Sequence, residues 1–342
     1  MLTEIIKADG ESLNIKGIKH AAELLIDGRL VAIPTETVYG LAANALDETA
    51  VAKIFRAKGR PQDNPLIVHL ADNSWLEKYA CEVPQSAYSL IEAFWPGPLT
   101  IILKKSPLIP DIVSAGLDSA AFRFPSHPVA AAIIRQAGVP LAAPSANISG
   151  SPSPTTAAHV INDLDGRIDA VVDGGRCAVG VESTVITLCT DIPTVLRPGG
   201  VTPEQLRAVL GQVCIDAAVM NALPEGARAA SPGMKYRHYA PNSHIVILKG
   251  RFDKITKFVN DKGSAVAVLC FDGEDASFTV PCVTYGAPHD SIAQAGRIFD
   301  ALRSLDSLGA QVVYARCPDM DGVGLAVYNR LLRAAGFEVI EL

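Results

Sequence analysis

The stretch Leu30-Val-Ala-Ile-Pro-Thr-Glu-Thr-Val-Tyr-Gly40 joins a short apolar run to a loop that carries hydroxyl, carboxylate and phenol groups. Leu30–Pro34 is typical of a buried strand, and an amphipathic pattern over residues 17–28 predicts a helix before it. Loops at the carboxyl ends of strands are where α/β proteins place their sites. The stretch therefore predicts an α/β fold with a site in this loop. The alternative is a turn in which a threonine caps the next helix.

Helices and strands interleave along the rest of the first 200 or so residues. We expect helices over 49–57, 85–94, 128–137 and 155–163, and strands over 66–70, 99–103, 120–124, 140–143, 168–172 and 183–188. The alternation is not strict, so the pattern favours a mixed, twisted sheet over a doubly wound one.

A second unit is expected from residue 245 onward, because the 342-residue chain is long enough for two domains. Its predicted elements are strands over 245–248, 265–269, 311–315 and 337–342, and helices over 290–305 and 325–335, which indicate a small parallel α/β domain. We predict domains at 10–201 and 245–342, with a connector over 202–244 that contains a helix at 203–210. No motif in 245–342 names a ligand, so the role of this domain is left open.

Composition narrows the class of protein. Hydrophobic residues make up 49% and charged residues 19%, which is typical of a folded chain, and the net charge of -6 argues against a general nucleic-acid coat. The seven cysteines are scattered and form no metal-binding pattern, as expected for reduced thiols. The start lacks the pattern of a signal peptide, and no apolar run approaches ~18 residues. We expect a cytoplasmic protein with no membrane partner.

A basic cluster lies between Lys53 and Arg60, with Arg56 and Lys58 between them. Lys58-Gly-Arg60 is followed by Pro61 and soon by a second proline, so the loop is stiffened. An arginine fork and a compact ammonium suit a nucleotide polyphosphate. The alternative is a solvated basic face.

Three further segments carry polar side chains after or within apolar runs: Pro144–Thr155, Glu182-Ser-Thr184 and Leu196-Arg-Pro-Gly-Gly200. Hydroxyls, amides and approachable backbone N–H groups bind phosphate, ribose and carboxylate oxygens. Arg123 stands between two phenylalanines on an apolar strand, and a buried arginine requires a carboxylate partner, from the protein or from a ligand. The common phosphate-loop, dinucleotide, zinc-protease and serine-hydrolase motifs are absent from the sequence.

Taken in order, these motifs closely resemble those of the YrdC-type threonylcarbamoyl-AMP synthases: Pro34-Thr-Glu-Thr-Val-Tyr-Gly-Leu41, Lys58-Gly-Arg60 with Asn64-Pro-Leu, Pro144-Ser-Ala-Asn147, Ser183-Thr184 and Leu196-Arg-Pro-Gly199. The resemblance covers roughly residues 10–205. Ser231–Pro241 and the small domain after it resemble the two-domain form, which extends the match to nearly the whole chain. The resemblance implies a mixed, twisted YrdC-like sheet with a concave face, and a small Rossmann-like α/β domain.

The resemblance also implies a reaction. L-Threonine, bicarbonate and ATP would give threonylcarbamoyl-AMP and pyrophosphate, and the product would serve the modification of an adenosine in tRNA. Mg²⁺ would come with ATP, and no organic cofactor is expected. The expected partners are these substrates and the downstream tRNA threonylcarbamoyl transferase machinery, with weak RNA binding left open.

Residue roles come from matching the family motifs. Lys58 and Arg60 would be catalytic, by neutralising charge on the phosphates. The threonine and its carbamate would be held by Thr37, His69, Arg123, Ser145 and Ser183. The nucleotide would be held by Arg60, Asn64, Ser119, Asn147, Ser153, Arg197 and Tyr236, with Thr35, Tyr39, Lys53 and Thr184 as secondary candidates. Tyr236 lies in the connector, which would then close over ATP as a lid.

Two other functions remain open at this point. The basic cluster could bind RNA without catalysing a reaction, although few aromatic residues lie near it. A carbamoyl-transfer domain of hydrogenase maturation shares the YrdC-like fold, but its zinc-finger cysteines and acylphosphatase part are not seen in this sequence.

Overall fold

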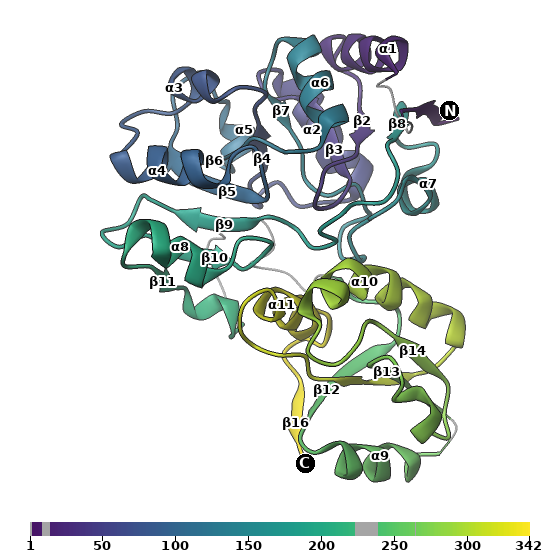
Figure 1. The fold of residues 1–342 in the computed structure, drawn as a ribbon. Coiled ribbons are helices and arrows are strands. Elements are labelled where there is room, and N and C mark those ends of the chain that lie inside the picture. The colour runs from purple at the N-terminus through teal and green to yellow at the C-terminus, as the bar shows by residue number, and fades with distance from the viewer. Residues whose placement is uncertain (1, 9–13, 223–238, 264) are drawn as a thin grey trace. The chain divides into compact units, whose positions relative to one another are not determined.

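The computed structural model describes residues 2–8, 14–222, 239–263 and 265–342. The chain divides into two compact units. The first comprises most of the chain up to Val219, and the second is formed by the C-terminal part together with residues 150–152 and 220–222. Figure 1 shows the helices and strands of each unit.

The first unit is built on a sheet of eleven strands. In spatial order these are β1 (Glu4–Lys7), β8 (Ala170–Asp173), β2 (Val31–Ile33), β3 (Gly40–Asn44), β7 (Leu141–Ala142), β4 (Ile67–His69), β6 (Ser119–Arg123), β5 (Leu99–Lys104), β9 (Thr184–Thr187), β10 (Thr194–Arg197) and β11 (Cys214–Ile215). Parallel pairs such as β4–β6 and antiparallel pairs such as β2–β3 both occur. The prediction of a mixed sheet is confirmed.

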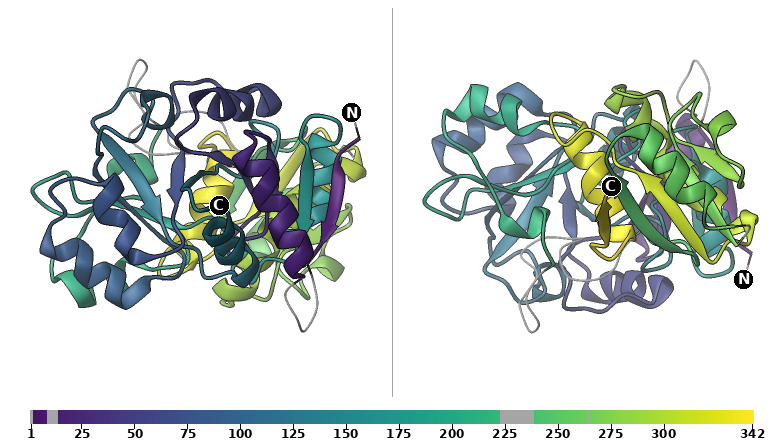
Figure 2. Two further views of the ribbon diagram at one scale, coloured as in Figure 1. Left: turned by 90° about the horizontal axis from the view of Figure 1, so that it is seen from above. Right: turned by 90° about the horizontal axis from the view of Figure 1, so that it is seen from below.

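Helices cover both faces of this sheet. They are α1 (Ile15–Ile26), α2 (Glu48–Lys58), α3 (Leu76–Tyr79), α4 (Gln85–Phe94), α5 (Asp111–Ser114), α6 (Pro128–Ala137), α7 (Ala157–Leu164) and α8 (Pro203–Leu210), with short 3-10 turns η1 (Asn73–Trp75) and η2 (Ala217–Val219). On β2, Val31 and Ile33 pack with α1 and α6, whereas Ala32 faces the core that contains α2. This alternation reflects the two-residue period of a strand. Figure 2 shows α1 and α6 side by side.

Helix α2 brings the end of the basic cluster, Lys58 and Arg60, to the site. Its N-cap is Asp47, whose carboxylate accepts hydrogen bonds from the N–H groups of Thr49 and Ala50, and its C-cap is Gly59 with φ of 62°. The left-handed conformation favours glycine, so the helix stops directly after Lys58. The sequence motif Lys58-Gly-Arg60 is thus a helix C-cap that turns Arg60 away from the helix axis.

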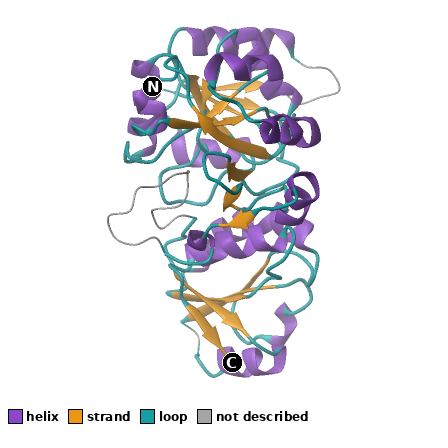
Figure 3. Ribbon diagram, turned by 90° about the vertical axis from the view of Figure 1, so that its left-hand side faces the viewer, coloured by secondary structure: helices purple, strands orange, loops and turns teal. Residues whose placement is uncertain are grey.

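The second unit is a five-stranded parallel sheet in the order β14 (Cys282–Thr284), β13 (Val266–Cys270), β15 (Val312–Arg316), β12 (His244–Lys249) and β16 (Val339–Glu341). Its other elements are α9 (Phe252–Asn260), α10 (Ser291–Ser304), α11 (Gly324–Ala334) and the turns η3 (Asp275–Ser277) and η4 (Leu305–Leu308). Helix α9 packs on one face, and α10 and α11 pack on the other (Figures 1 and 3). The prediction of a small parallel α/β domain is confirmed.

Several observed elements have no counterpart in the sequence prediction. β3 is one of them, because Gly40-Leu-Ala-Ala-Asn44 has little β-propensity, and the strand forms through its antiparallel pairing with β2 and β7. The others are the helices α3, α5 and α9 and the strands β1, β10, β11 and β14, together with short 3-10 turns. α8, β11 and η2 lie in the segment predicted as the connector, and they belong to the first unit. Residues 223–238 of the connector, Tyr236 among them, lie outside the described residues.

None of the described helices combines the length and apolarity needed to span a membrane.

Candidate active site

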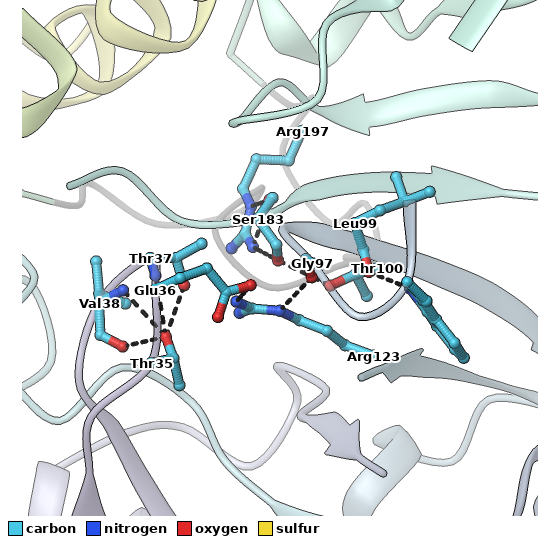
Figure 4. Close-up of polar contacts among 11 residues, drawn as sticks. Thr35, Glu36, Thr37, Val38, Gly97, Leu99, Thr100, Arg123, Ser183 and Arg197 are labelled. Atoms are coloured by element: carbon cyan, nitrogen blue, oxygen red, sulfur yellow. Dashed lines mark hydrogen bonds and ion pairs between the residues drawn. The ribbon is translucent and has the colours of Figure 1, made fainter. Parts of the chain in front are cut away.

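The candidate site lies in the first unit, where polar side chains from several loops and strand ends meet (Figure 4). The loop after β2 supplies Thr35, Glu36 and Thr37, and β6 ends on Arg123. Residues around Ser183 enter from the start of β9. The site is therefore assembled from segments far apart in the sequence, as in other α/β proteins.

The loop after β2 is held by its own hydroxyls. The Thr35 hydroxyl donates to the carbonyl of Val38 over 2.6 Å, lies 2.9 Å from the Thr37 hydroxyl, and accepts from the N–H groups of Thr37 and Val38. Thr35, a secondary ligand candidate by sequence, thus has a structural role. This turn fixes the direction in which Glu36 and Thr37 leave the loop.

Arg123 and Glu36 form a buried ion pair. Arg123 Nη2 lies 2.7 Å from Glu36 Oε1, and the exposed fractions of the two side chains are 4% and 10%. Burial alone would raise the pKa of Glu36, but the Arg123 guanidinium outweighs it and holds that pKa below its ordinary value. Nε of Arg123 donates to the carbonyl of Gly97. Within the described part of the chain, Nη1 has no hydrogen-bond partner, so it is available for a ligand.

His69 stands beside Arg123, because the two residues are in register on the neighbouring parallel strands β4 and β6. Burial, and after it the charge of Arg123, lowers the pKa of His69 to about 3. The imidazole is therefore neutral at pH 7. A neutral ring beside a guanidinium can contact a ligand without adding a second positive charge.

Ser183 links the site to Arg197. Its hydroxyl lies 2.7 Å from the Thr100 hydroxyl, and Arg197 donates to the Ser183 carbonyl from Nε and Nη2 over 3.1 and 2.9 Å. Arg197-Pro-Gly199 can approach so closely because Gly199 has no side chain: a Cβ there would lie 2.3 Å from the backbone N of Thr184. The Leu196–Gly199 motif thus places an arginine directly against Ser183, just before β9.

Lys58 is only 1% exposed and points into the loop after β7. Its Nζ donates to the carbonyls of Ser145 and Asn147, each over 2.5 Å. Burial, and after it the charge of Arg60, holds the pKa of Lys58 well below its ordinary value. The geometry gives Lys58 a role in fixing the Ser145–Asn147 loop, which the sequence motif does not indicate.

The remaining nucleotide candidates surround this loop. Arg60 Nη2 donates to the carbonyls of Asn64 and Pro65, and the buried Oδ1 of Asn64 has no hydrogen-bond partner among the described residues. The Ser153 hydroxyl donates to the carboxylate of Glu182, next to Ser183 in the chain. The loop that contains Ser145 runs beside the loop after β2. These candidates therefore belong to the same region as Arg123.

One further ligand candidate lies away from Arg123, and three others make hydrogen bonds to backbone carbonyls within the fold. Ser119 begins β6, four residues from Arg123 and thus ~13 Å along the strand, where it lines a separate cavity of about 440 Å³ with Lys104 and Asp118. The fully buried Tyr39 donates to the Gly175 carbonyl. The Thr184 hydroxyl donates to the Val201 carbonyl, and Lys53 to that of Gly28.

The sequence motifs assign no role to Glu36, Thr100 and Glu182. Glu36 lies within the motif after the first strand, and a buried arginine needs a carboxylate, but no local pattern links the two residues. Among the described residues no group of three or more His, Cys, Asp or Glu side chains could hold a metal ion.

Two family models match the chain in sequence. Residues 23–199 match a model described as telomere recombination, and residues 201–336 match the threonylcarbamoyl-AMP synthase C-terminal domain.

Individual proteins are similar over nearly the whole length. A threonylcarbamoyl-AMP synthase from Pyrococcus abyssi is 45% identical over 95% of this chain and 96% of its own. One from Bacillus subtilis is 46% identical over 97% of this chain and 96% of its own. The crystal structure of P. abyssi Sua5 complexed with L-threonine superposes with a TM-score of 0.93 at 44% identity, over 99% of this chain and 100% of that one.

Proposed function

This chain belongs to the threonylcarbamoyl-AMP synthase family, and we propose on that premise that it converts L-threonine, bicarbonate and ATP into threonylcarbamoyl-AMP and pyrophosphate. The enzyme is then a nucleotidyltransferase whose product serves the modification of tRNA. The observation that carries the proposal is the accessible Nη1 of Arg123 beside a neutral His69, next to the Ser183–Arg197 pair. This arrangement offers a cation for a carboxylate within a site that is otherwise rich in hydroxyls.

Threonine would bind through its carboxylate at Arg123. Nη2 and Nε of that arginine are held by Glu36 and Gly97, so the guanidinium is oriented before the substrate arrives. The hydroxyls of Thr37 and Ser183 would position the rest of the amino acid. The known complex of P. abyssi Sua5 with L-threonine supports threonine as a ligand of this fold.

The chemistry requires the neutral amine of threonine, whose ordinary pKa is about 8. The nitrogen attacks the carbon of bicarbonate, a C–N bond forms, and water leaves to give the carbamate. A carbamate oxygen then attacks the α-phosphorus of ATP, and pyrophosphate leaves. No residue of this site is assigned as a general base.

The nucleotide would be bound by Arg60, Asn64, Asn147, Ser153 and Arg197, with Lys58 holding their common loop. Since burial disfavours the charged form of Lys58, Arg60 is the residue that would neutralise charge on the departing pyrophosphate. We propose that Mg²⁺ enters with the phosphates of ATP and with water, which requires no dedicated set of protein ligands. Ser119 and Tyr236 remain candidates for more distant parts of the nucleotide.

The proposal is tested by pyrophosphate release from ATP, with threonine and bicarbonate present together or omitted in turn. We expect release only when both are present, and identification of threonylcarbamoyl-AMP by mass spectrometry. Release that ignores threonine, or no release together with salt-sensitive RNA binding, would overturn the proposal in favour of another nucleotide reaction or an RNA-binding module.

A further inference from the structure

The second unit contains a cavity at the carboxyl edge of its parallel sheet, about 350 Å³ in volume. Lys249 ends β12, Arg316 ends β15, and Phe271 directly follows β13. All three residues line the cavity, together with Pro288, His289, Pro318, Asp319 and Met320. The cavity is thus built from the ends of three neighbouring strands and not from one loop.

The topology places this cavity where open α/β sheets bind ligands. β12 and β15 are neighbours, with Leu248 in register with Arg316. The chain leaves β12 for α9 on one face of the sheet and leaves β15 for α11 on the opposite face (Figure 1). Neighbouring strands whose connections depart to opposite faces open a crevice at their carboxyl ends, and that crevice is the usual ligand position.

Arg316 is fixed in this crevice by a carboxylate and two aromatic rings. Its Nε and Nη2 donate to both carboxylate oxygens of Glu274 over 2.9 to 3.1 Å. Its guanidinium lies 5.3 Å from the ring centres of Phe252 and Phe271, and its carbonyl accepts from the Tyr285 hydroxyl. The remaining nitrogen, Nη1, makes no hydrogen bond within the described residues and is free to bind an oxyanion.

A second cation and an apolar wall complete the cavity. Lys249 is half-exposed, and its ammonium meets Glu341 over 3.2 Å, a contact that a stronger anion can replace at low cost. Pro288, Pro318 and the largely buried Phe271 supply the apolar part of the lining. His289 is held with φ of 61°, a left-handed conformation that strains a non-glycine residue, and it bonds Asp319 over 3.1 Å.

We propose that this cavity binds a small organic oxyanion, a phosphate or a carboxylate attached to a planar or apolar body. The oxyanion binds Arg316 Nη1 and Lys249, and the body lies against the apolar lining formed by Pro288, Pro318 and Phe271. The proposal concerns the second unit alone and does not rest on the reaction proposed for the first.

Met320 provides a local readout, because it lines the cavity and is one of only four methionines in the chain. The protein is labelled with ¹³C-methyl methionine, the Met320 signal is assigned with Met320→Leu, and the sample is titrated with AMP, phenylacetate and adenosine. AMP carries a phosphate, phenylacetate a carboxylate, and adenosine a planar body with no oxyanion. Binding of AMP at the site of the first unit does not interfere, since the Met320 signal reports the second.

We expect a saturable shift of the Met320 signal with at least one of the two anions, and at least tenfold weaker binding of adenosine. Lys249→Ala raises the Kd of that anion about tenfold. The matched control, Lys254→Ala, replaces an exposed lysine of α9 and leaves this Kd unchanged. A shift with AMP alone identifies nucleotides as the class, and a shift with phenylacetate alone identifies aromatic carboxylates. No saturable shift with either anion, or an unchanged Kd in Lys249→Ala, overturns the proposal.

Discussion

Arg123 and Glu36 are 87 positions apart in sequence, and the structure places Nη2 of the one 2.7 Å from Oε1 of the other in a nearly dry environment. In the sequence, Arg123 stands between two phenylalanines, and no neighbouring residue identifies the carboxylate that a buried arginine requires. The protein supplies the carboxylate that neutralises Arg123, and one guanidinium nitrogen is still left for a ligand. The pair therefore neutralises a buried charge within the fold, and it leaves one nitrogen for the threonine carboxylate that we propose as the ligand.

The role of Arg123 in threonine binding is tested by Arg123→Lys. A lysine keeps the charge but cannot bind Glu36, Gly97 and a ligand carboxylate together, so we expect the KM for threonine to rise at least tenfold. The KM for ATP changes little. The control is Arg29→Ala, which removes a half-exposed arginine from the same unit. An unchanged KM for threonine, or an equal rise in both KM values, would contradict the assignment.

Glu36→Gln tests the other half of the pair. The glutamine retains the shape but leaves Arg123 with no compensating charge, and breaking a buried pair in this way costs about 3–5 kcal/mol of unfolding free energy. Urea unfolding followed by tryptophan fluorescence reports the first unit, since both tryptophans, Trp75 and Trp95, lie in it. Glu92→Gln, on the exposed side of α4, serves as the control. A loss below about 0.5 kcal/mol, on the same order as a surface substitution, would show that the pair is not essential.

The lowered pKa of His69 predicts that the stability of the fold depends on pH. Its pKa falls to about 3 in the fold, whereas an unfolded histidine titrates near 6.5. Below pH ~6.5 the unfolded chain binds a proton at this histidine and the folded chain does not. The free energy of unfolding therefore falls by about 1.4 kcal/mol per pH unit as the pH decreases toward 3, and this group does not change it above pH ~7.

The measurement is the difference between the wild type and His69→Gln in urea unfolding at pH 7.5 and 5. We expect the free energy of unfolding to fall by about 2 kcal/mol more for the wild type than for the variant between pH 7.5 and pH 5. His20, half-exposed on α1, supplies the control as His20→Gln. Equal losses in the wild type and His69→Gln would show that His69 takes up protons in the fold as readily as it does in the unfolded chain.

Most helices and buried strands can be predicted from the sequence because apolar periodicity is a local property, as α6 and α4 illustrate. β3 cannot be predicted in this way, because its glycine and alanines form a strand only by pairing with β2 and β7. The motifs identify residues of the site, but pairings such as Arg123 with Glu36 depend on sheet register, which no local pattern contains. The role of Lys58 is hidden in the sequence for the same reason.

Lys58 and Arg60 are expected to differ in effect although they are two positions apart. Lys58→Met keeps an apolar stem but leaves the buried carbonyls of Ser145 and Asn147 without their donor, which costs roughly 2–4 kcal/mol of unfolding free energy as well as activity. The bonds of Arg60 to the carbonyls of Asn64 and Pro65 are only partly buried, so water can replace them in Arg60→Ala, and the main effect is expected on the rate of pyrophosphate release. Tryptophan fluorescence in urea and pyrophosphate release, measured on both variants, separate the two effects. If Lys58→Met were as stable as the wild type and inactive, Lys58 would act on the phosphates directly and not through the loop.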